Sequence, residues 1–169
     1  MGRRNYSEAD RIITIFTKSY GKLALIAKGV RKPSSRKRGH LEIFSYLKFS
    51  ARENGNIDYL SEAEVIDPFE EIRKDLKKIS VAYFLCEVVN RTTREDEPHE
   101  RLFELLTRAL KDLKNSHQTR LLRQQFIRDT LVILGFWPEG KTLTNPDNLL
   151  EEIVEREMFT KRVGRKVLS

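Results

Sequence analysis

The sequence predicts an α+β protein in which a small N-terminal β-barrel is followed by an all-α helical bundle. Two observations support this class. Apolar and polar side chains alternate in short runs through the first 66 residues, which is typical of strands. After residue 67 the apolar residues recur at helical spacing. A chain of 169 residues can hold both parts, and we place the domains at residues 1–66 and 67–169.

Four strands and their turns are expected in the first part. The segment Lys18–Gly21 is typical of a tight turn. Asn54 with Gly55 is a strong hairpin signal, because both residue types accept a positive φ. Short strands joined by such turns favour a small barrel or a sandwich. The expected strands cover residues 11–17, 22–30, 43–52 and 57–66.

Four amphipathic helices are expected in the second part. Asp67 is expected to cap the first helix, with Pro68 at its first position and Glu70 completing a capping box. The later helices are expected to begin near residues 98, 118 and 145. The connections between them are short, so the helices should be antiparallel neighbours. The apolar stripe of the first helix consists of Ile72, Leu76, Ile79, Tyr83 and Cys86.

Positive charge is concentrated near the beginning of the chain. Residues 1–41 contain eleven Lys or Arg and two acidic residues, a net charge of +9. The whole chain has a net charge of +7, so residues 42–169 carry a net charge of −2. A dense cationic segment focuses a positive field, and the commonest partner of such a field is a phosphate backbone.

A loop rich in cations and turn residues, Val30–Gly39, lies between the second and third expected strands. Five of its ten residues are Lys or Arg. Alone, such a loop fits a solvated segment or a targeting signal as well as a binding site. Cations and aromatic residues on the flanking strands favour single-stranded nucleic acid, because cations follow the backbone and aromatic rings stack on bases. The expected contacts are Lys22, Lys28, Arg31, Lys32, Arg36, Lys37, Arg38, Tyr46 and Lys48. Tyr46 fits either a base-stacking residue or a packed surface aromatic.

The sequence contains no recognisable catalytic or metal-binding pattern. Glu8 and Asp10 are interpreted as ion-pairing residues that order the first hairpin. Cys86 is the single cysteine, so we expect neither a disulfide nor a zinc site, and no cofactor. No apolar run approaches the length of a membrane span. The expected class is a cytoplasmic binding protein without enzymatic activity.

Several runs of residues resemble a known family. They include Tyr6-Ser-Glu8-Ala-Asp10, Tyr20-Gly21-Lys22-Leu23, Ala27-Lys28-Gly29-Val30-Arg31 and, in the helical part, Leu134-Gly135-Phe136. These runs resemble the RecO family of bacterial DNA repair and recombination mediators. The resemblance extends over nearly the whole chain and is most specific between Glu8 and Phe44.

The resemblance implies an oligonucleotide-binding (OB) fold followed by a helical domain. It also implies binding to single- and double-stranded DNA, annealing of complementary strands, and loading of recombinase onto DNA coated by single-strand-binding protein. The implied partners are RecR and the acidic tail of the single-strand-binding protein. Two features depart from the family. The zinc module of four cysteines that many members carry is missing, and the strand before Tyr6 would be short, because the true start lies upstream or because the barrel lacks part of an edge.

Arginines on the third expected helix form a candidate site for that tail. Arg120, Arg123 and Arg128 lie around Leu122 and Phe126. They fit either a solvated helix face or a groove in which Arg binds a carboxylate and the apolar residues hold an anchor. Two alternatives to the DNA hypothesis stay open: an RNA-binding OB protein, and an adaptor whose basic loop contacts an acidic protein.

Overall fold

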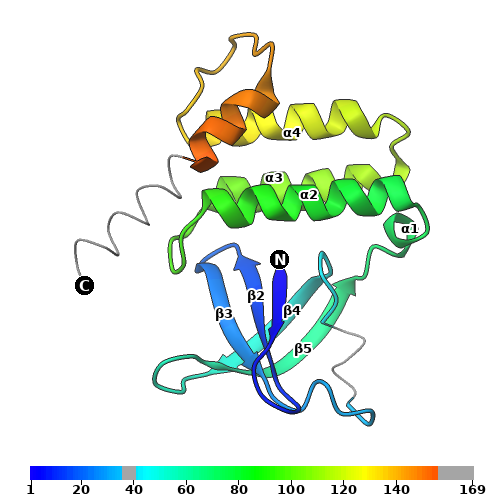
Figure 1. The fold of residues 1–169 in the computed structure, drawn as a ribbon, viewed down its shortest axis with the longest axis vertical. Coiled ribbons are helices and arrows are strands. Elements are labelled where there is room, and N and C mark those ends of the chain that lie inside the picture. Colours follow the sequence, from blue (N-terminus) through cyan, green and yellow to red (C-terminus); the bar gives the residue numbers. More distant parts are fainter. Residues whose placement is uncertain (36–40, 156–169) are drawn as a thin grey trace.

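The computed structural model describes residues 1–35 and 41–155 and has a curved sheet beneath a layer of helices (Figure 1). The strands are β1 (Gly2–Asn5), β2 (Arg11–Thr17), β3 (Gly21–Ala27), β4 (Tyr46–Arg52) and β5 (Tyr59–Asp67). The helices are α1 (Glu70–Arg73), α2 (Leu76–Thr92), α3 (Glu100–Asn115) and α4 (Thr119–Ile133). Residues 146–155 are also helical. The expected α+β class is therefore confirmed.

The five strands follow the order β1-β2-β3-β5-β4 in one sheet. Every pairing is antiparallel except β3 with β5, which meet in parallel at Ile26 and Tyr59. Within the described residues, no ladder joins β1 to β4. The sheet is therefore curved but not closed, which is consistent with the expected OB-fold, a partly open barrel. The strand before Tyr6 is present as the short β1.

The first helix begins differently from the expectation. The Oδ1 atom of Asp67 accepts a hydrogen bond from Phe69 N at 2.8 Å, and Phe69 has a φ of 52°. The chain then forms only the four-residue α1. The long helix α2 is capped instead by Asp75, whose Oδ1 accepts from Lys77 N at 2.8 Å. The prediction of a capping box based on Asp67 and Glu70 was wrong, because the aspartate stabilises a turn at Phe69.

The break between α1 and α2 also changes which side chains are buried. Ile72 lies on α1 and is buried, whereas Leu76 at the start of α2 is 81% exposed and Tyr83 is exposed as well. Ile72 and Leu76 do not share one continuous helix, and on α2 the buried face is turned away from Tyr83, so the predicted stripe is wrong at Leu76 and Tyr83. The buried face of α2 consists of Ala82, Leu85, Cys86, Val88 and Val89.

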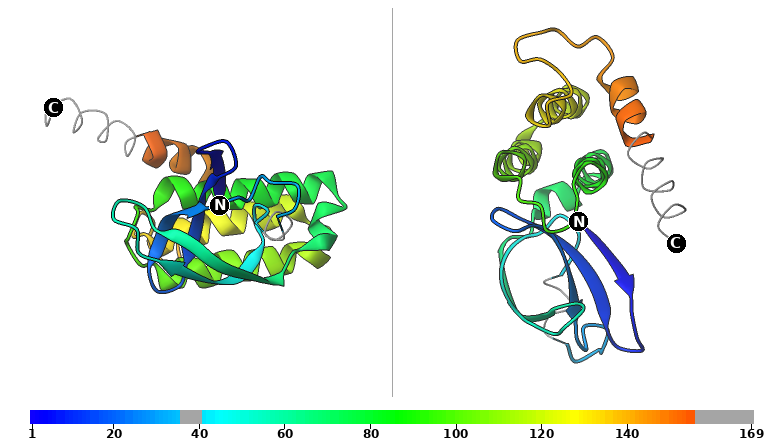
Figure 2. Two further views of the ribbon diagram at one scale, coloured as in Figure 1. Left: turned by 90° about the horizontal axis from the view of Figure 1, so that it is seen from below. Right: turned by 90° about the vertical axis from the view of Figure 1, so that its left-hand side faces the viewer.

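The apolar stripes predicted for the later helices are buried. Leu102, Leu106, Ala109, Leu110 and Leu113 of α3 all lie in the core, in agreement with the sequence pattern. Figure 2 shows α2, α3 and α4 as a bundle that lies against one end of the sheet. Phe16 and Phe44 from the sheet region belong to the same buried cluster as the helices. The sheet therefore shares a core with the bundle.

The turn between β2 and β3 fits closely against the connection between α2 and α3. Asp96 N donates to Lys22 O at 3.1 Å. Lys18 Nζ lies 2.9 Å from a carboxylate oxygen of Glu100 and 3.1 Å from one of Glu104. At Gly21, which has a φ of 69°, a Cβ atom would lie 2.0 Å from the carbonyl oxygen of Glu97. This close approach fixes the helices relative to the sheet.

Candidate nucleic-acid interface

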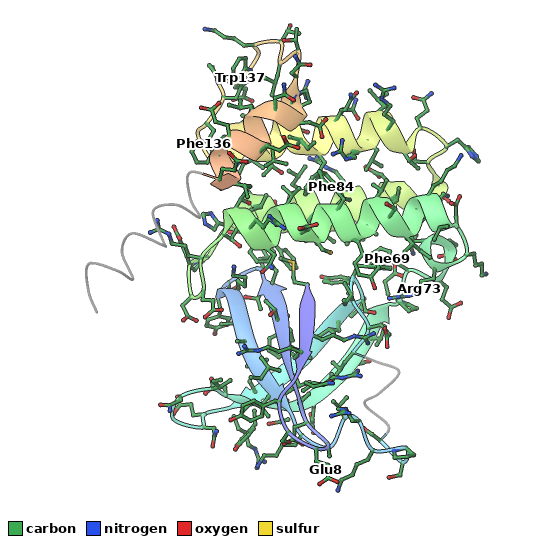
Figure 3. All side chains as sticks on the ribbon, viewed as in Figure 1. Glu8, Phe69, Arg73, Phe84, Phe136 and Trp137 are labelled. Atoms are coloured by element: carbon green, nitrogen blue, oxygen red, sulfur yellow. The ribbon has the colours of Figure 1, made fainter. Side chains whose placement is uncertain are left out.

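Three segments meet at the end of the sheet that lies opposite the helices, which we call the distal end. They are the β1–β2 turn (residues 6–10), the segment after β3 (residues 28–35) and the β4–β5 turn (residues 53–58). Figure 3 shows Glu8 at this end, far from the labelled residues of the helices. The cationic arm predicted from the sequence begins here.

Hydrogen bonds join the β1–β2 turn to the base of the arm. Gly29 N donates to Asp10 Oδ1 at 2.8 Å, and Arg31 N donates to Ala9 O at 3.0 Å. The Arg31 guanidinium also donates to Ser7 O at 3.1 Å. Asp10 therefore orders this end by a hydrogen bond to the backbone, where the sequence had suggested an ion pair.

Three of the predicted DNA contacts are exposed at the distal end. Lys28, Arg31 and Lys32 are all accessible. Lys28 Nζ lies over the ring of Tyr59, 3.8 Å from its centroid, which is a cation–π geometry. The predicted contacts Arg36, Lys37 and Arg38 lie outside the described residues.

Lys22 does not belong to this surface. Its side chain is buried, at 8% exposure, at the end of the sheet that faces the helices. Its Nζ donates to Asn90 O and Thr93 O, both at 2.8 Å, at the carboxyl end of α2. A cation there satisfies terminal carbonyl groups and the negative end of the helix dipole. The expectation that Lys22 contacts DNA is therefore corrected, because its ammonium group is used inside the protein.

Tyr46 and Lys48 lie on β4, away from the arm. Tyr46 is half-buried, and its ring centroid lies 6.3 Å from that of Phe103 in the layer between sheet and helices. It packs against the buried core that the sheet shares with the helices, which agrees with the interpretation of Tyr46 as a packed aromatic. Lys48 is exposed, but the residue opposite it in the register of β4 and β5 is Glu64. Glu62 is also exposed on β5. This acidic neighbourhood makes the outer face of β4 and β5 a poor track for phosphates.

Two residues outside the predicted set of DNA contacts lie at the distal end. Tyr6 is 57% exposed in the β1–β2 turn. Arg52 is exposed at the end of β4, where it pairs with Tyr59. The signal for Tyr6 was an aromatic residue inside a polar turn next to a strand, a position with no apolar neighbours to pack against.

The arginines of α4 divide between two grooves. Arg120 and Arg123 line one between α2 and α4, which we call the α2–α4 groove, together with the exposed Leu76. Arg123 also lies over the ring of Phe84 at 3.9 Å and pairs with Asp147. A second groove, between α3 and α4, includes Arg128.

The apolar residues of that predicted set have different positions. Phe126 is 2% exposed in the core, so a peptide cannot reach it. Leu122 is half-buried against the same core. Arg128 forms an ion pair with Asp129 at 2.8 Å. The structure therefore replaces the predicted apolar partners of Arg120 with Leu76 and Val81, which line the α2–α4 groove.

The described residues contain no group of three or more His, Cys, Asp or Glu side chains that could hold a metal ion. Cys86 is buried, and burial raises the pKa of its thiol. Among the helices of residues 1–35 and 41–155, none is long and apolar enough to cross a membrane.

Comparisons with known proteins agree with this architecture. The family model described as "Recombination protein O N terminal" matches residues 1–69, and "Recombination protein O C terminal" matches residues 73–142. Curated relatives named DNA repair protein RecO come from Halalkalibacterium halodurans, at 30% identity over 135 residues, and Pelotomaculum thermopropionicum, at 33% over 135 residues. These alignments cover 80% of this chain and 53% and 52% of the two relatives. The chain thus spans about half the length of the curated relatives it matches.

Proposed function

Because the chain belongs to the RecO family of DNA repair and recombination proteins, we propose that it is a non-enzymatic mediator that binds single- and double-stranded DNA and anneals complementary strands. The observation that carries the proposal is the exposed cationic base of the arm at the distal end. Lys28, Arg31 and Lys32 lie there within five consecutive residues, and Arg36, Lys37 and Arg38 follow within the next six. Cations in this arrangement can track a phosphate backbone.

The proposal also assigns different binding partners to the two parts of the chain. We assign DNA binding to residues 1–66, and contact with the tail of the single-strand-binding protein to residues 67–169. RecR is the other proposed partner, and loading of recombinase in the cytoplasm is the proposed outcome. The direct test is annealing of complementary oligonucleotides by the purified protein without a nucleotide cofactor. Annealing no faster than in the absence of protein would contradict the proposal.

Binding to single-stranded DNA is expected to depend strongly on salt. With about four to six phosphate contacts, the slope of log affinity against log salt concentration should be roughly −3 to −4, at about −0.7 per contact. Replacing Lys28 and Lys32 by Glu should weaken binding to all sequences alike and make the slope shallower. Fluorescence anisotropy of a labelled oligonucleotide over a series of salt concentrations measures both.

The control for this experiment is Lys111→Glu, a charge reversal at an exposed residue of α3 far from the distal end. Its affinity and salt slope should match those of the wild type. Equal effects of the α3 variant and the double variant would mean that overall net charge, rather than the distal end, governs binding. An RNA competitor of equal sequence tests whether the polymer is DNA.

The α2–α4 groove is the proposed site for the acidic tail. A carboxylate can pair with Arg120 while an apolar end residue packs on Leu76 and Val81. Arg120→Ala should weaken binding of an acidic peptide with an apolar carboxyl-terminal residue by about 1–2 kcal/mol, with no change in affinity for naked DNA. Anisotropy of the labelled peptide measures the effect. Arg128→Ala, in the other groove, is the matched control, and equal losses for both variants would contradict the assignment.

A further inference from the structure

An aromatic residue stands beside the cations of the distal end with its side chain largely in solvent. Tyr6 is 57% exposed, although tyrosine rings normally bury most of their apolar surface. It lies in the β1–β2 turn, at the same end of the sheet as Lys28, Arg31 and Lys32. A second aromatic residue at this end, Tyr59, is half-buried and has Lys28 over its ring at 3.8 Å. Among the residues that the structure describes, Tyr6 is therefore the exposed aromatic at this end of the sheet.

The backbone that carries Tyr6 is held in place from two sides. Within the turn, Tyr6 N donates to Asp10 O at 3.2 Å. Across to the arm, Asp10 Oδ1 accepts from Gly29 N at 2.8 Å, and Ser7 O accepts from the Arg31 guanidinium at 3.1 Å. These hydrogen bonds hold the β1–β2 turn and the base of the arm together. A backbone ordered before binding reduces the conformational entropy that is lost when a ligand stacks on the side chain it carries.

From this geometry we propose that Tyr6 is a base-stacking residue that makes the distal end favour single strands over duplex. The proposal rests on the proposed DNA binding and adds a specificity-determining residue to it. Cations contact phosphates in either form of DNA, whereas an aromatic ring needs an unstacked base. In a duplex the faces of the bases are occupied by their neighbours. Stacking was one of two roles that the sequence allowed for Tyr46, but Tyr46 is half-buried and packs near Phe103, whereas Tyr6 is exposed.

The inference predicts a selective loss in Tyr6→Ala. Its affinity for a single-stranded oligonucleotide should fall about 5- to 150-fold, the range that one stacked base is worth. Its affinity for an abasic strand of equal length should not change, because the phosphates are the same. Its salt slope should also stay unchanged, because no cation is lost. Tyr6→Phe should retain the wild-type affinity.

Tyr20→Ala is the matched control. Tyr20 is 69% exposed, more than Tyr6, but it lies in the β2–β3 turn at the end of the sheet that faces the helices. Its replacement should leave affinity for every strand unchanged. An oligonucleotide containing 2-aminopurine supplies a second readout, since stacking on tyrosine quenches its fluorescence and Tyr6→Ala should abolish that quenching.

The outcomes separate this inference from the proposed function. Wild-type protein that binds normal and abasic strands equally, with Tyr6→Ala unchanged on both, would overturn the stacking role while leaving DNA binding intact. Wild-type protein that binds neither strand at low salt would overturn both. Circular dichroism and the melting temperature of each variant establish that it is folded before binding is compared.

Discussion

Gly21→Ala is expected to be among the most destabilising single-methyl changes in this chain. Gly21 has a φ of 69°, which costs a residue with a side chain about 1–2 kcal/mol. The added Cβ would also lie 2.0 Å from Glu97 O and 2.5 Å from Glu97 C, both backbone atoms that cannot rotate away. Forcing the α2–α3 connection outward adds about 1–3 kcal/mol. We expect a total loss of about 2–5 kcal/mol and a fall in Tm of roughly 5–15 °C, measured by calorimetry or denaturant unfolding.

Gly55→Ala separates the two causes. Gly55 has a φ of 63°, close to that of Gly21, but nothing lies within 4 Å of its added Cβ. Only the conformational cost of about 1–2 kcal/mol should remain. If the two variants lose equal stability, the contact between the β2–β3 turn and the α2–α3 connection does not stabilise the protein.

Lys22→Met is expected to destabilise the protein without weakening DNA binding of the folded fraction. Its ammonium group donates to Asn90 O and Thr93 O, and Met preserves most of the apolar stem while leaving both carbonyls without this donor. Hydrogen bonds from a charged group are worth about 1.5–3 kcal/mol. The additional loss of a cation at the carboxyl end of α2 acts in the same direction. A loss of about 2–3 kcal/mol in unfolding free energy is expected from denaturant titration.

Lys28→Met should show the reverse pattern. Lys28 is exposed and lies over Tyr59 at the distal end, so its loss should reduce DNA affinity while changing stability little. Together the two variants test whether Lys22 is a structural residue. Both variants are compared at a temperature well below their melting points. If folded Lys22→Met loses as much DNA affinity as Lys28→Met, Lys22 contacts DNA and the structural role is wrong.

Local sequence patterns were sufficient to predict the elements whose structure depends on interactions between residues close together in the chain. The strand Arg11–Thr17 was predicted with its observed bounds, because alternating apolar residues and a tight turn at residues 18–20 specify a hairpin. The buried stripe of α3 was likewise readable from helical spacing alone. The first helix was misread because Asp67 and Asp75 are both good caps, and the sequence pattern does not rank them. Packing of Phe69 and Ile72, both fully buried, places the break between them and α2.

The sequence by itself determined the class of the protein, its family resemblance and the concentration of positive charge in the first 41 residues. These depend on composition, periodicity and motifs, which are properties of neighbouring residues. Only the tertiary structure decided which cations face solvent. Lys22 lies on β3 and Lys28 follows directly after its end, six residues on, yet Lys22 binds the carboxyl end of a helix inside the protein and Lys28 lies at the distal end. That difference depends on α2, some 70 residues farther along the chain, whose carbonyl groups meet Lys22 only after the helices pack on the sheet. For the same reason Tyr46 packs against the core beside Phe103, while Tyr6 is exposed near the base of the arm.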